Sequence, residues 1–302
     1  MITVSLIVLH YKGRKLTAQC LASLKKIKKD GFQLKTVVVI NNPEENLTEL
    51  VKKFPGVTFL ETGRNLGFAG GNNFGLSWVK KKGSDWLMIL NNDTLVAPDF
   101  MIELLKAARK KSEGGIFAPK IYFAPGFEFH RERYLKKDLG KVIWFAGGRV
   151  DWANIATRHQ GVDEVDRGQF EKVKESEFIT GCAMLIKKEV LDSVGLFDPK
   201  YFLYYEDADL CQRAIKKGYR LYFVPQAKIW HQVAASSEIG GNLHDYFLVR
   251  NQLLFGLRYA PGRSKAALIK QSLRFLLAGR PWQKRGVLDF YLGRLGQGSW
   301  GK

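Results

Sequence analysis

Three carboxylates fall within four residues in the segment Glu206-Asp207-Ala208-Asp209. The segment follows an aromatic run at 201–205 and opens a stretch of helical spacing that Gly218 ends. A carboxylate held at a helix start is suited to act as a general base on a hydroxyl group. The alternative is that these acids only favour the helix, since negative charge in a first turn is stabilised by about 0.3 to 1 kcal/mol per residue. The segment alone leaves both interpretations open.

A fourth acid, Asp93, follows an apolar strand-like run at 86–90 and is preceded by Asn91 and Asn92. A carboxylate at the carboxyl end of a strand suits a hard divalent cation that also takes phosphate oxygens as ligands. An Asx turn is the alternative. His231 ends a later apolar run, and although a lone histidine is usually structural, we expect it to fall beside Asp93 as an imidazole ligand.

The stretch 63–73 holds four glycines and three asparagines. Such residues permit left-handed backbone and leave main-chain amides accessible at a helix start, where an anion is readily held. The spacing fits neither the G-x-G-x-x-G dinucleotide pattern nor a P-loop. A glycine-rich turn with a structural role is the alternative.

The elements that must position these residues alternate between strand and helix over the first hundred residues. Continuous apolar runs predict buried strands, and helical spacing between them predicts helices. The strands are expected at 2–9, 36–40, 57–60 and 86–90, and the helices at 16–27, 47–54, 75–81 and 98–111. This rhythm indicates a parallel sheet with helices on both faces. Ligands bind at the carboxyl ends of such strands, which selects the loops 10–13, 41–45, 62–73 and 91–94.

The regular alternation stops between 119 and 176, where single aromatics, glycines and mixed charges indicate a hairpin-rich insertion that shapes a substrate site. We assign no strands within it. A strand is expected again at 178–187, where Gly181 indicates a close backbone approach. The elements expected after it are a short helix at 188–194, a strand at 219–224 and helices at 243–259 and 264–278.

Length and composition bound the class of protein. A chain of 302 residues forms one large α/β domain with an appendage, or two modest domains. Its three cysteines are far apart and lack zinc-site spacing, which favours a reduced cytosolic compartment. The chain opens on a strand-like run without a basic leader, so we expect no secretory signal. No apolar run reaches the length of a membrane span.

The net charge of +19 is unevenly distributed, since residues 258–302 contain ten Lys and Arg against one acid, Asp289. A basic amphipathic helix at 264–278 is followed by aromatic anchors that include Trp282 and Trp300. This pattern favours an anionic membrane surface over a nucleic-acid groove, which would need base-edge readers or stacking aromatics on a sheet. Packing against a second copy of the chain, in a homodimer, is the alternative.

The chain as a whole resembles the family 2 glycosyltransferases of the GT-A fold, in particular the bacterial rhamnosyltransferase-like branch that builds cell-surface polysaccharides. The order and spacing of several motifs carry this resemblance over most of the length. The motifs are His10-Tyr11-Lys12-Gly13, Asn65-Leu66-Gly67-Phe68-Ala69-Gly70-Gly71-Asn72-Asn73, Leu90-Asn91-Asn92-Asp93-Thr94, Thr180-Gly181-Cys182-Ala183, Gly195-Leu196-Phe197-Asp198, Tyr204-Tyr205-Glu206-Asp207-Ala208-Asp209-Leu210, and Pro225 onward to His231.

The resemblance implies a single α/β domain of the GT-A type at 1–240, with a mostly parallel central sheet flanked by helices. Its Rossmann-like half at 1–118 would bind the sugar nucleotide and its second half at 119–240 the acceptor. A basic amphipathic helical region at 241–302 would follow. The donor would be a dTDP, UDP or GDP sugar and the acceptor a glycan or a polyprenyl-linked molecule. We expect a cytoplasmic protein, peripheral at the inner face of the cell membrane, with no nucleic-acid partner.

The same motifs imply the roles of single residues. Asp207 resembles the family's catalytic base, and Asp93 resembles the surviving acid of its metal-binding D-x-D element, which together with His231 would hold Mg²⁺ or Mn²⁺. The residues assigned to orienting or binding the acceptor are Glu206, Asp209, Gly181, Cys182 and Trp144. Those assigned to the nucleotide sugar are His10, Tyr11, Asn41, Asn42, Arg64, Asn65, Gly70, Asn73, Asn91, Asn92 and Asp93.

Two positions depart from the family pattern. Asn41 stands where many relatives have an Asp that contacts the nucleobase, and Asn91 replaces the first acid of the D-x-D element. The first departure bears on which nucleotide is bound. The second predicts weak metal affinity until the donor supplies its own oxygens.

The chemistry of glycosyl transfer agrees with these roles. The reaction needs an acceptor hydroxyl made nucleophilic and a diphosphate leaving group made stable. One base acting on the face opposite the diphosphate predicts inversion at the anomeric carbon. A glycoside hydrolase is an alternative, but it would need two carboxyl groups on opposite sides of a bond, which adjacent acids at one helix start fit poorly. A basic nucleic-acid-binding module is the non-enzymatic alternative.

Overall fold

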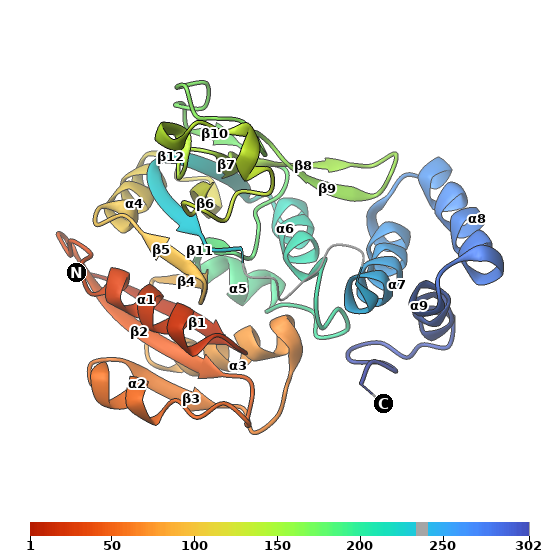
Figure 1. Ribbon diagram of the computed structural model, residues 1–302, viewed down its shortest axis with the longest axis horizontal. Coiled ribbons are helices and arrows are strands. Elements are labelled where there is room, and N and C mark those ends of the chain that lie inside the picture. The colour runs from red at the N-terminus through yellow and green to blue at the C-terminus, as the bar shows by residue number, and fades with distance from the viewer. Residues whose placement is uncertain (234–240, 302) are drawn as a thin grey trace.

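The computed structural model describes residues 1–233 and 241–301. A mixed β-sheet runs through the molecule (Figure 1). Its strands lie in the order β10-β12-β6-β11-β4-β1-β2-β3. The first half consists of the parallel strands β1 (Ile2–His10), β2 (Phe32–Ile40), β3 (Thr58–Glu61) and β4 (Trp86–Asn91). The helices between them are α1 (Arg14–Leu24), α2 (Thr48–Lys53) and α3 (Gly67–Lys81). The predicted alternation of strands and helices is confirmed here.

The second half continues the same sheet with β6 (Gly114–Phe123), β11 (Ala183–Lys187) and β12 (Arg220–His231). β11 is antiparallel to both β4 and β6, whereas β12 is parallel to β6. The short strands β5 (Thr94–Val96) and β10 (Lys174–Glu175) pair with β12, and β7 (Ile143–Phe145) pairs with β6. The helical segments of this half are α4 (Phe100–Lys110), η1 (Arg131–Arg133), η2 (Lys136–Asp138), α5 (Lys188–Val194) and α6 (Glu206–Lys216).

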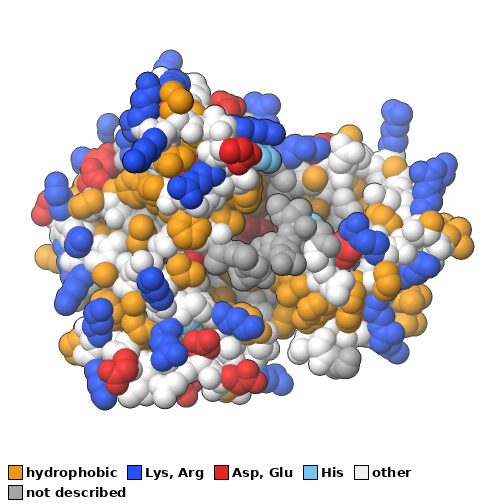
Figure 2. All heavy atoms as spheres, viewed as in Figure 1, with side chains coloured by type: hydrophobic (Ala, Val, Ile, Leu, Met, Phe, Trp, Pro, Cys, Tyr) orange, Lys and Arg blue, Asp and Glu red, His pale blue; other side chains and the backbone are white. Residues whose placement is uncertain are grey.

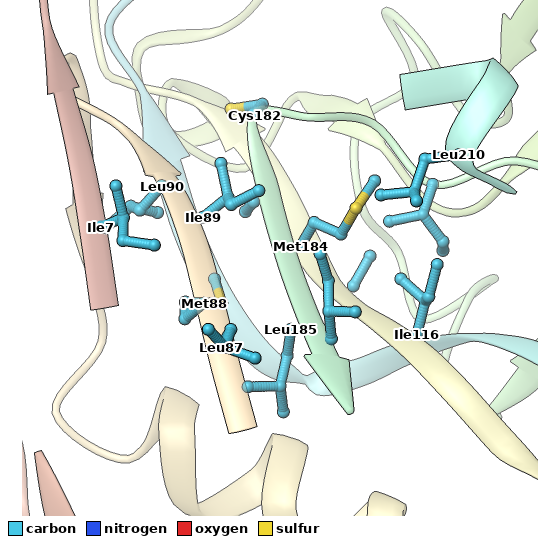
Figure 3. Close-up of a cluster of buried hydrophobic side chains, with 14 of the residues drawn as sticks. Ile7, Leu87, Met88, Ile89, Leu90, Ile116, Cys182, Met184, Leu185 and Leu210 are labelled. Carbon is cyan, nitrogen blue, oxygen red and sulfur yellow. The ribbon is translucent and has the colours of Figure 1, made fainter. Parts of the chain in front are cut away.

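The core forms on both faces of the central strands because these strands are apolar throughout. Residues 87–90 of β4 and 183–186 of β11 are completely buried. Figure 3 shows Leu90 and Met184 on these neighbouring strands, and Leu210 brings α6 into the same cluster. This packing fixes α6, and with it the acidic segment at its start, against the sheet.

Two strands of the second half differ from the sequence-based prediction, since no strand was expected at β6 and the strand expected at 219–224 is longer, and both run through a proline. β6 continues past Pro119 to Phe123, and β12 continues past Pro225 to His231. Proline removes a ladder hydrogen bond and usually marks an edge or a bulge. In the β6–β12 ladder Pro119 lies opposite Val224, and the register shifts between Val224 and Lys228. The expectation that regular structure stops at residue 119 is therefore wrong for the last five residues of β6.

The hairpin character expected of the insertion is confirmed by β8 (Gly148–Asp151) and β9 (Ala156–His159), which form an antiparallel pair. The hairpin reaches toward the C-terminal helices (Figure 1). There the Trp152 ring stacks on Phe255 with the centroids 5.7 Å apart. The insertion therefore connects the sheet to the C-terminal helices.

The C-terminal helices α7 (Asn242–Tyr259), α8 (Gly262–Ala278) and α9 (Pro281–Tyr291) gather at one side of the sheet (Figure 1). The first two were predicted, while α9, which has Pro281 at its first position, was not. Within the described residues no helix combines the length and the apolar character needed to cross a membrane. The predicted domain boundary after residue 240 lies outside the described residues.

Candidate active site

The pairing of β5 with β12 brings Asp93 and His231 together. Thr94, the first residue of β5, lies opposite His231, the last residue of β12, and Asp93 occupies the turn just before β5. The Asp93 carbonyl accepts a hydrogen bond of 2.8 Å from Gln232 N. Asp93 Oδ1 lies 3.1 Å from His231 Nε2, and both side chains are largely buried. The structure thus places the histidine beside the acid.

An oxygen and an imidazole nitrogen at this separation fit a divalent cation. Two ligands at right angles around Mg²⁺ or a similar ion, each at 2.0–2.1 Å, lie about 3 Å apart. Asp93 Oδ1 is buried and has no other partner in the described part of the chain. The described residues contain no group of three or more His, Cys, Asp or Glu side chains that could hold a metal. A cation bound by Asp93 and His231 would therefore complete its coordination with diphosphate and water oxygens.

Trp144 and Cys182 flank the Asp93–His231 pair. The Trp144 ring, on β7, meets the His231 ring edge-on with the centroids 4.6 Å apart, and it meets His159 of β9 in the same way at 4.5 Å. The Cys182 thiol adjoins His231. Burial acts to lower the pKa of His231, but the neighbouring Cys182 and Asp93 raise it well above its ordinary value. Sequence analysis did not assign His159 to the site.

Asp207 lies in the first turn of α6 with its carboxylate fixed by two main-chain amides. Oδ2 accepts a hydrogen bond of 2.9 Å from Gly181 N, and Oδ1 accepts one of 2.8 Å from Ala208 N. A Cβ at Gly181 would lie 3.0 Å from the Phe68 ring and 3.5 Å from the Asp207 Cβ. The close backbone approach expected at Gly181 is confirmed, and this approach orients the carboxylate.

The surroundings of Asp207 change its proton affinity. Burial raises the pKa of Asp207 to about 6, although the hydrogen bonds from Gly181 and Ala208 act in the opposite direction. Burial, together with the negative charge of Asp207, also raises the pKa of Glu206 well above its ordinary value. For Asp207 the main cause is therefore burial. A carboxylate with a pKa near 6 is ionised at neutral pH and still binds a proton more tightly than an exposed Asp, which suits a general base.

The consecutive residues Gly181 and Cys182 lie between Asp207 and the Asp93–His231 pair. Gly181 holds Asp207 through its amide, as described above. Burial raises the pKa of the Cys182 thiol, and the charges of both Asp93 and Asp207 add to this effect, so both carboxylates lie near it. The Cys182 carbonyl also accepts a hydrogen bond of 2.9 Å from Asn91 N on β4. One dipeptide before β11 therefore links the candidate base to the candidate cation ligands.

The loop that leads into Asp207 has a strained backbone. Phe202, Tyr204 and Tyr205 have φ angles of 65°, 68° and 70°, a region that residues other than glycine rarely adopt. Phe202 also contacts the start of α3, where its carbonyl accepts a hydrogen bond of 3.2 Å from Ala69 N. A Cβ at Gly67 would lie only 2.5 Å from Phe202. The loop therefore joins the first turn of α6 to the first turn of α3.

Two consecutive side chains of α7 hold this loop. Asn251 Nδ2 donates to the carbonyls of Tyr201, Leu203 and Tyr204 at 2.8, 2.7 and 2.9 Å. Arg250, which is completely buried, donates to the Tyr201 carbonyl at 2.9 Å and to Asn251 Oδ1 at 3.0 Å. We call this pair the Arg250–Asn251 clamp. Sequence analysis did not assign it, and the only signal was that polar residues interrupt the apolar character of the predicted helix at this point.

Asn41 holds loops together and has no group left for a nucleobase. Its Oδ1 accepts hydrogen bonds from Leu66 N at 2.9 Å and Thr62 Oγ1 at 3.3 Å. Its amide donates to Asn65 Oδ1 at 3.2 Å and to the Gly67 carbonyl at 3.0 Å. Since an asparagine side chain offers two donors and two acceptor positions, all four are used. This corrects the expectation that Asn41 contacts the donor.

Asp209 is also a structural residue and not an acceptor-binding one. It is completely buried, and its carboxylate lies 2.7 Å from Arg213 Nε, 3.0 Å from Arg258 Nη1 and 2.7 Å from the Tyr259 hydroxyl. The Tyr201 hydroxyl donates a further hydrogen bond of 3.3 Å. These contacts join α6 to α7 on the side away from Asp207.

His10, Asn73 and Gly70 likewise serve the packing of the loops. His10 is completely buried, with Nδ1 2.8 Å from Thr17 Oγ1 and Nε2 3.5 Å from Glu45 Oε2. Both polar atoms of the Asn73 side chain bond the main chain of Phe197, at 2.8 and 3.0 Å. Gly70 belongs to α3, which begins at Gly67 and not at the expected residue 75.

The glycines of α3 mainly allow this helix to approach the sheet. A Cβ at Gly71 would lie 2.5 Å from the Leu9 side chain, and one at Gly75 would lie 2.8 Å from Val39. The structural alternative for most of this glycine-rich stretch is therefore favoured over a loop that cradles phosphate.

Of the remaining residues assigned to the nucleotide sugar, Tyr11 and Arg64 are exposed and Asn91 is partly exposed, so their side chains are accessible to a ligand. Three others use their side chains in hydrogen bonds within the protein. Asn42 Oδ1 accepts from Glu44 N, Asn65 Oδ1 accepts from Gly67 N, and Asn92 Nδ2 donates to Lys12 O and Thr17 Oγ1.

Comparison with known proteins identifies the family. The model of glycosyltransferase-like family 2 matches residues 3–245. The chain is 27% identical over 203 residues to N-acetylglucosaminyl-diphospho-decaprenol L-rhamnosyltransferase of Mycobacterium tuberculosis, which covers 62% of each chain. It is 22% identical over 227 residues to dTDP-rhamnosyl transferase RfbF of Shigella flexneri, covering 72% of this chain and 69% of that one. The chain thus spans less than two thirds of the length of the mycobacterial relative.

A solved structure shows the same fold. The crystal structure of GalNAc-T7 with UDP, GalNAc and Mn²⁺ superposes with a TM-score of 0.63 at 16% identity, covering 92% of this chain and 56% of that one. The predicted GT-A fold, with its mostly parallel sheet and C-terminal helices, is confirmed by this likeness. Since the family model matches most of the length, the chain belongs to glycosyltransferase-like family 2, a family of enzymes.

Proposed function

We propose that the protein is a metal-dependent, inverting glycosyltransferase that moves a sugar from a nucleoside-diphosphate sugar to a hydroxyl of a glycan or lipid-linked acceptor. The observation that carries this proposal is the position of Gly181 and Cys182 between Asp207 on one side and Asp93 and His231 on the other. This arrangement supports a site in which a base and the ligands of a cation would serve the same pair of substrates.

Asp207 takes the proton of the acceptor hydroxyl. Its two backbone hydrogen bonds hold the carboxylate in one orientation, and each oxygen keeps a free lone pair for the acceptor. Removal of that proton commonly contributes about 10² to 10⁴ in rate. The acceptor oxygen then attacks the anomeric carbon on the face opposite the diphosphate, and the configuration inverts.

Asp93 and His231 would hold Mg²⁺ or Mn²⁺ at the donor diphosphate. A divalent cation bound there supplies Lewis-acid stabilisation of the charge on the leaving diphosphate. Tyr11, Arg64 and Asn91 are the accessible side chains for the rest of the donor. The presence of UDP and Mn²⁺ in the GalNAc-T7 structure, and the dTDP in the name of the Shigella relative, support testing UDP and dTDP donors.

The acceptor is proposed from the relatives. The name of the mycobacterial relative specifies an N-acetylglucosaminyl-diphospho-decaprenol acceptor and an L-rhamnosyl group. A polyprenyl-linked acceptor would place this protein in the cytoplasm, peripheral at the inner face of the cell membrane, in the synthesis of bacterial surface polysaccharide.

The test is a thermal-shift panel of dTDP, UDP, GDP and their sugars, with and without Mn²⁺. A ligand present at about 100 times its Kd stabilises the folded protein by about 2.7 kcal/mol, and no acceptor is needed. We expect one nucleotide series to raise the Tm only when Mn²⁺ or Mg²⁺ is present. Absence of a shift with every nucleotide, with and without the ions, would contradict the proposal.

The hydrolase alternative gains no support from the geometry. Glu206 and Asp207 are neighbours in one helical turn, whereas a glycoside hydrolase needs carboxyl groups on opposite sides of the bond it cleaves. Release of free sugar from a glycan in the absence of any nucleotide would restore this alternative.

A further inference from the structure

The outer side of α8 and α9 exposes a continuous set of large apolar side chains. We call it the α8–α9 face, and its members are Ile269, Leu273, Leu277, Leu288, Tyr291 and Leu292, each between 41% and 82% exposed. The residues on α8 recur every four positions and so share one side of the helix. The Ser272 and Tyr291 hydroxyls, 2.7 Å apart, join the two helices at this face. Figure 2 shows apolar side chains gathered at this end of the molecule among Lys and Arg. An exposed apolar patch of this kind marks an interaction surface.

The charge around the α8–α9 face is of one sign. Lys270 and Arg274 each follow an apolar member of the face by one position on α8 and are exposed. The only acid in residues 262–302 is Asp289, and it is completely buried, where it accepts hydrogen bonds from Tyr246 and Ser299 and lies 3.9 Å from Arg294 Nη1. The surroundings of the face therefore attract anions.

A basic cavity of about 530 Å³ borders this face. It is lined by Arg285, Arg294, Leu295, Gln297, Gly298 and Ser299. Arg285 precedes Leu288 by three positions and Leu292 by seven, so it lies on the same side of α9 as these leucines. One of its N–H groups is bonded to Ser299 Oγ at 3.0 Å. Two guanidinium groups and an amide at one cavity are the donors that recognise a phosphate group.

We propose that the α8–α9 face docks on an anionic phospholipid bilayer, with its apolar side chains in the acyl-chain boundary and a lipid phosphate in the Arg285–Arg294 cavity. An amphipathic helix with a basic border lies in the plane of a membrane in this way. This inference deepens the proposed function, because it rests on an acceptor that is carried by a lipid.

A second copy of the chain fits the face less well. A twofold-symmetric contact would bring Lys270 and Arg274 of one copy against the same residues of the other, with only the buried Asp289 to offset them. A bilayer that contains anionic lipid complements this charge, and it also accepts the apolar side chains.

The test is flotation of the full chain with vesicles of phosphatidylcholine alone and of phosphatidylcholine mixed with phosphatidylglycerol, without nucleotide. We expect binding to the anionic vesicles only, weakened by salt. The double variant Leu273→Ser/Leu277→Ser should bind at least about tenfold more weakly. The matched control is Phe127→Ser/Leu135→Ser, which changes exposed apolar residues elsewhere and should bind like the unmodified protein.

A second pair of variants tests the cavity. Arg285→Gln/Arg294→Gln should weaken binding to the anionic vesicles more than Arg131→Gln/Arg133→Gln does. The second variant is the control, because it removes the same charge from exposed positions in η1. The docking proposal would be overturned if the protein bound both vesicle types equally, or if the two pairs of arginine variants lost binding equally. It would also be overturned if sedimentation showed a dimer that Leu273→Ser/Leu277→Ser dissociates. Nucleotide-dependent thermal shifts of the same variants separate this failure from a failure of the proposed function, because those shifts involve no membrane.

Discussion

The main-chain amide of Gly181 donates a hydrogen bond of 2.9 Å to Asp207 Oδ2. This bond ties the carboxylate at the start of α6 to the segment that enters β11, a central strand of the sheet. The rigid sheet therefore sets the position of a side chain that lies at the end of a strained loop. A base whose position is fixed before the substrate binds loses little entropy in the reaction.

Replacing the base tests its role directly. The variant Asp207→Asn keeps the size of the side chain but cannot accept the acceptor's proton, so kcat should fall by about 10² to 10⁴. The thermal shift produced by nucleotide and Mn²⁺ should change little, since Asp207 is not proposed to hold the donor. Asp30→Asn, at an exposed acid in the connection between α1 and β2, serves as the control and should retain full activity. Full activity of Asp207→Asn would remove this residue from the mechanism.

The raised pKa of Asp207 predicts a pH dependence of the rate. Since burial raises this pKa to about 6, the carboxylate is ionised above that pH and protonated below it. The logarithm of kcat should therefore fall with unit slope as the pH drops below about 6, and it should be level near neutral pH. A profile whose lower limb has its midpoint near 4 would mean that Asp207 titrates like an exposed acid.

The raised pKa of Asp207 also makes the free energy of unfolding depend on pH. The folded chain binds this proton more tightly than the unfolded chain, whose Asp has a pKa of 3.8. The resulting stabilisation is present below about pH 4 and is lost as the pH rises through about 6. As the pH rises across this interval, the Tm of the unmodified protein should therefore fall relative to the Tm of Asp207→Asn.

Loss of either cation ligand should abolish the metal dependence of donor binding. We expect Asp93→Asn and His231→Ala to lose most of the thermal shift that a nucleotide sugar gives with Mn²⁺, because two protein ligands leave no substitute when one is removed. A chelator should have the same effect on the unmodified protein. His130→Ala, at an exposed histidine, is the control. A normal Mn²⁺-dependent shift in both site variants would place the cation elsewhere.

The Arg250–Asn251 clamp predicts a link between α7 and the base. Asn251→Ala leaves the carbonyls of Tyr201, Leu203 and Tyr204 without this donor, and a buried polar group without a partner costs about 1 to 3 kcal/mol. The Tm should fall by several degrees. The kcat should fall more than the donor KM rises, since the loop positions Asp207 and not the nucleotide.

The neighbouring residue provides the control for the clamp. Gln252 donates to the Asn154 carbonyl at 2.9 Å, at the tip of the β8–β9 hairpin, and not to the strained loop. Gln252→Ala should therefore leave kcat nearly unchanged. If both alanine variants lost kcat equally, α7 would act through general stability and not through the loop.

The first half of the sheet could be predicted because its signals are local. Apolar runs mark β1, β2 and β4, and each of β1 to β3 is followed directly by a helix. The second half depends on pairing between distant segments. Pro119 and Pro225 argue against continuous strands on local grounds, yet the β6–β12 ladder includes Pro119 and resumes beyond Pro225 at Lys228.

The candidate site shows the same division. The motifs indicated Asp93, His231 and Asp207, because their residue types carry the chemistry. The roles of Asn41 and Asp209 could not be read in this way, since an asparagine that binds a ligand and one that bonds four loop atoms have the same side chain. Their contacts depend on which segments the fold brings near, as do those of Asn251.

The ladder between β5 and β12 has a consequence for the order of events during synthesis. The two cation ligands enter the growing chain far apart in time, and the second arrives only with the last residue of β12. A nascent chain that has completed the whole Rossmann-like half still lacks the imidazole. Under the proposed function, in which Asp93 and His231 hold the cation, tight binding of the donor would require the last long strand, and affinity for the donor would report that the sheet is complete.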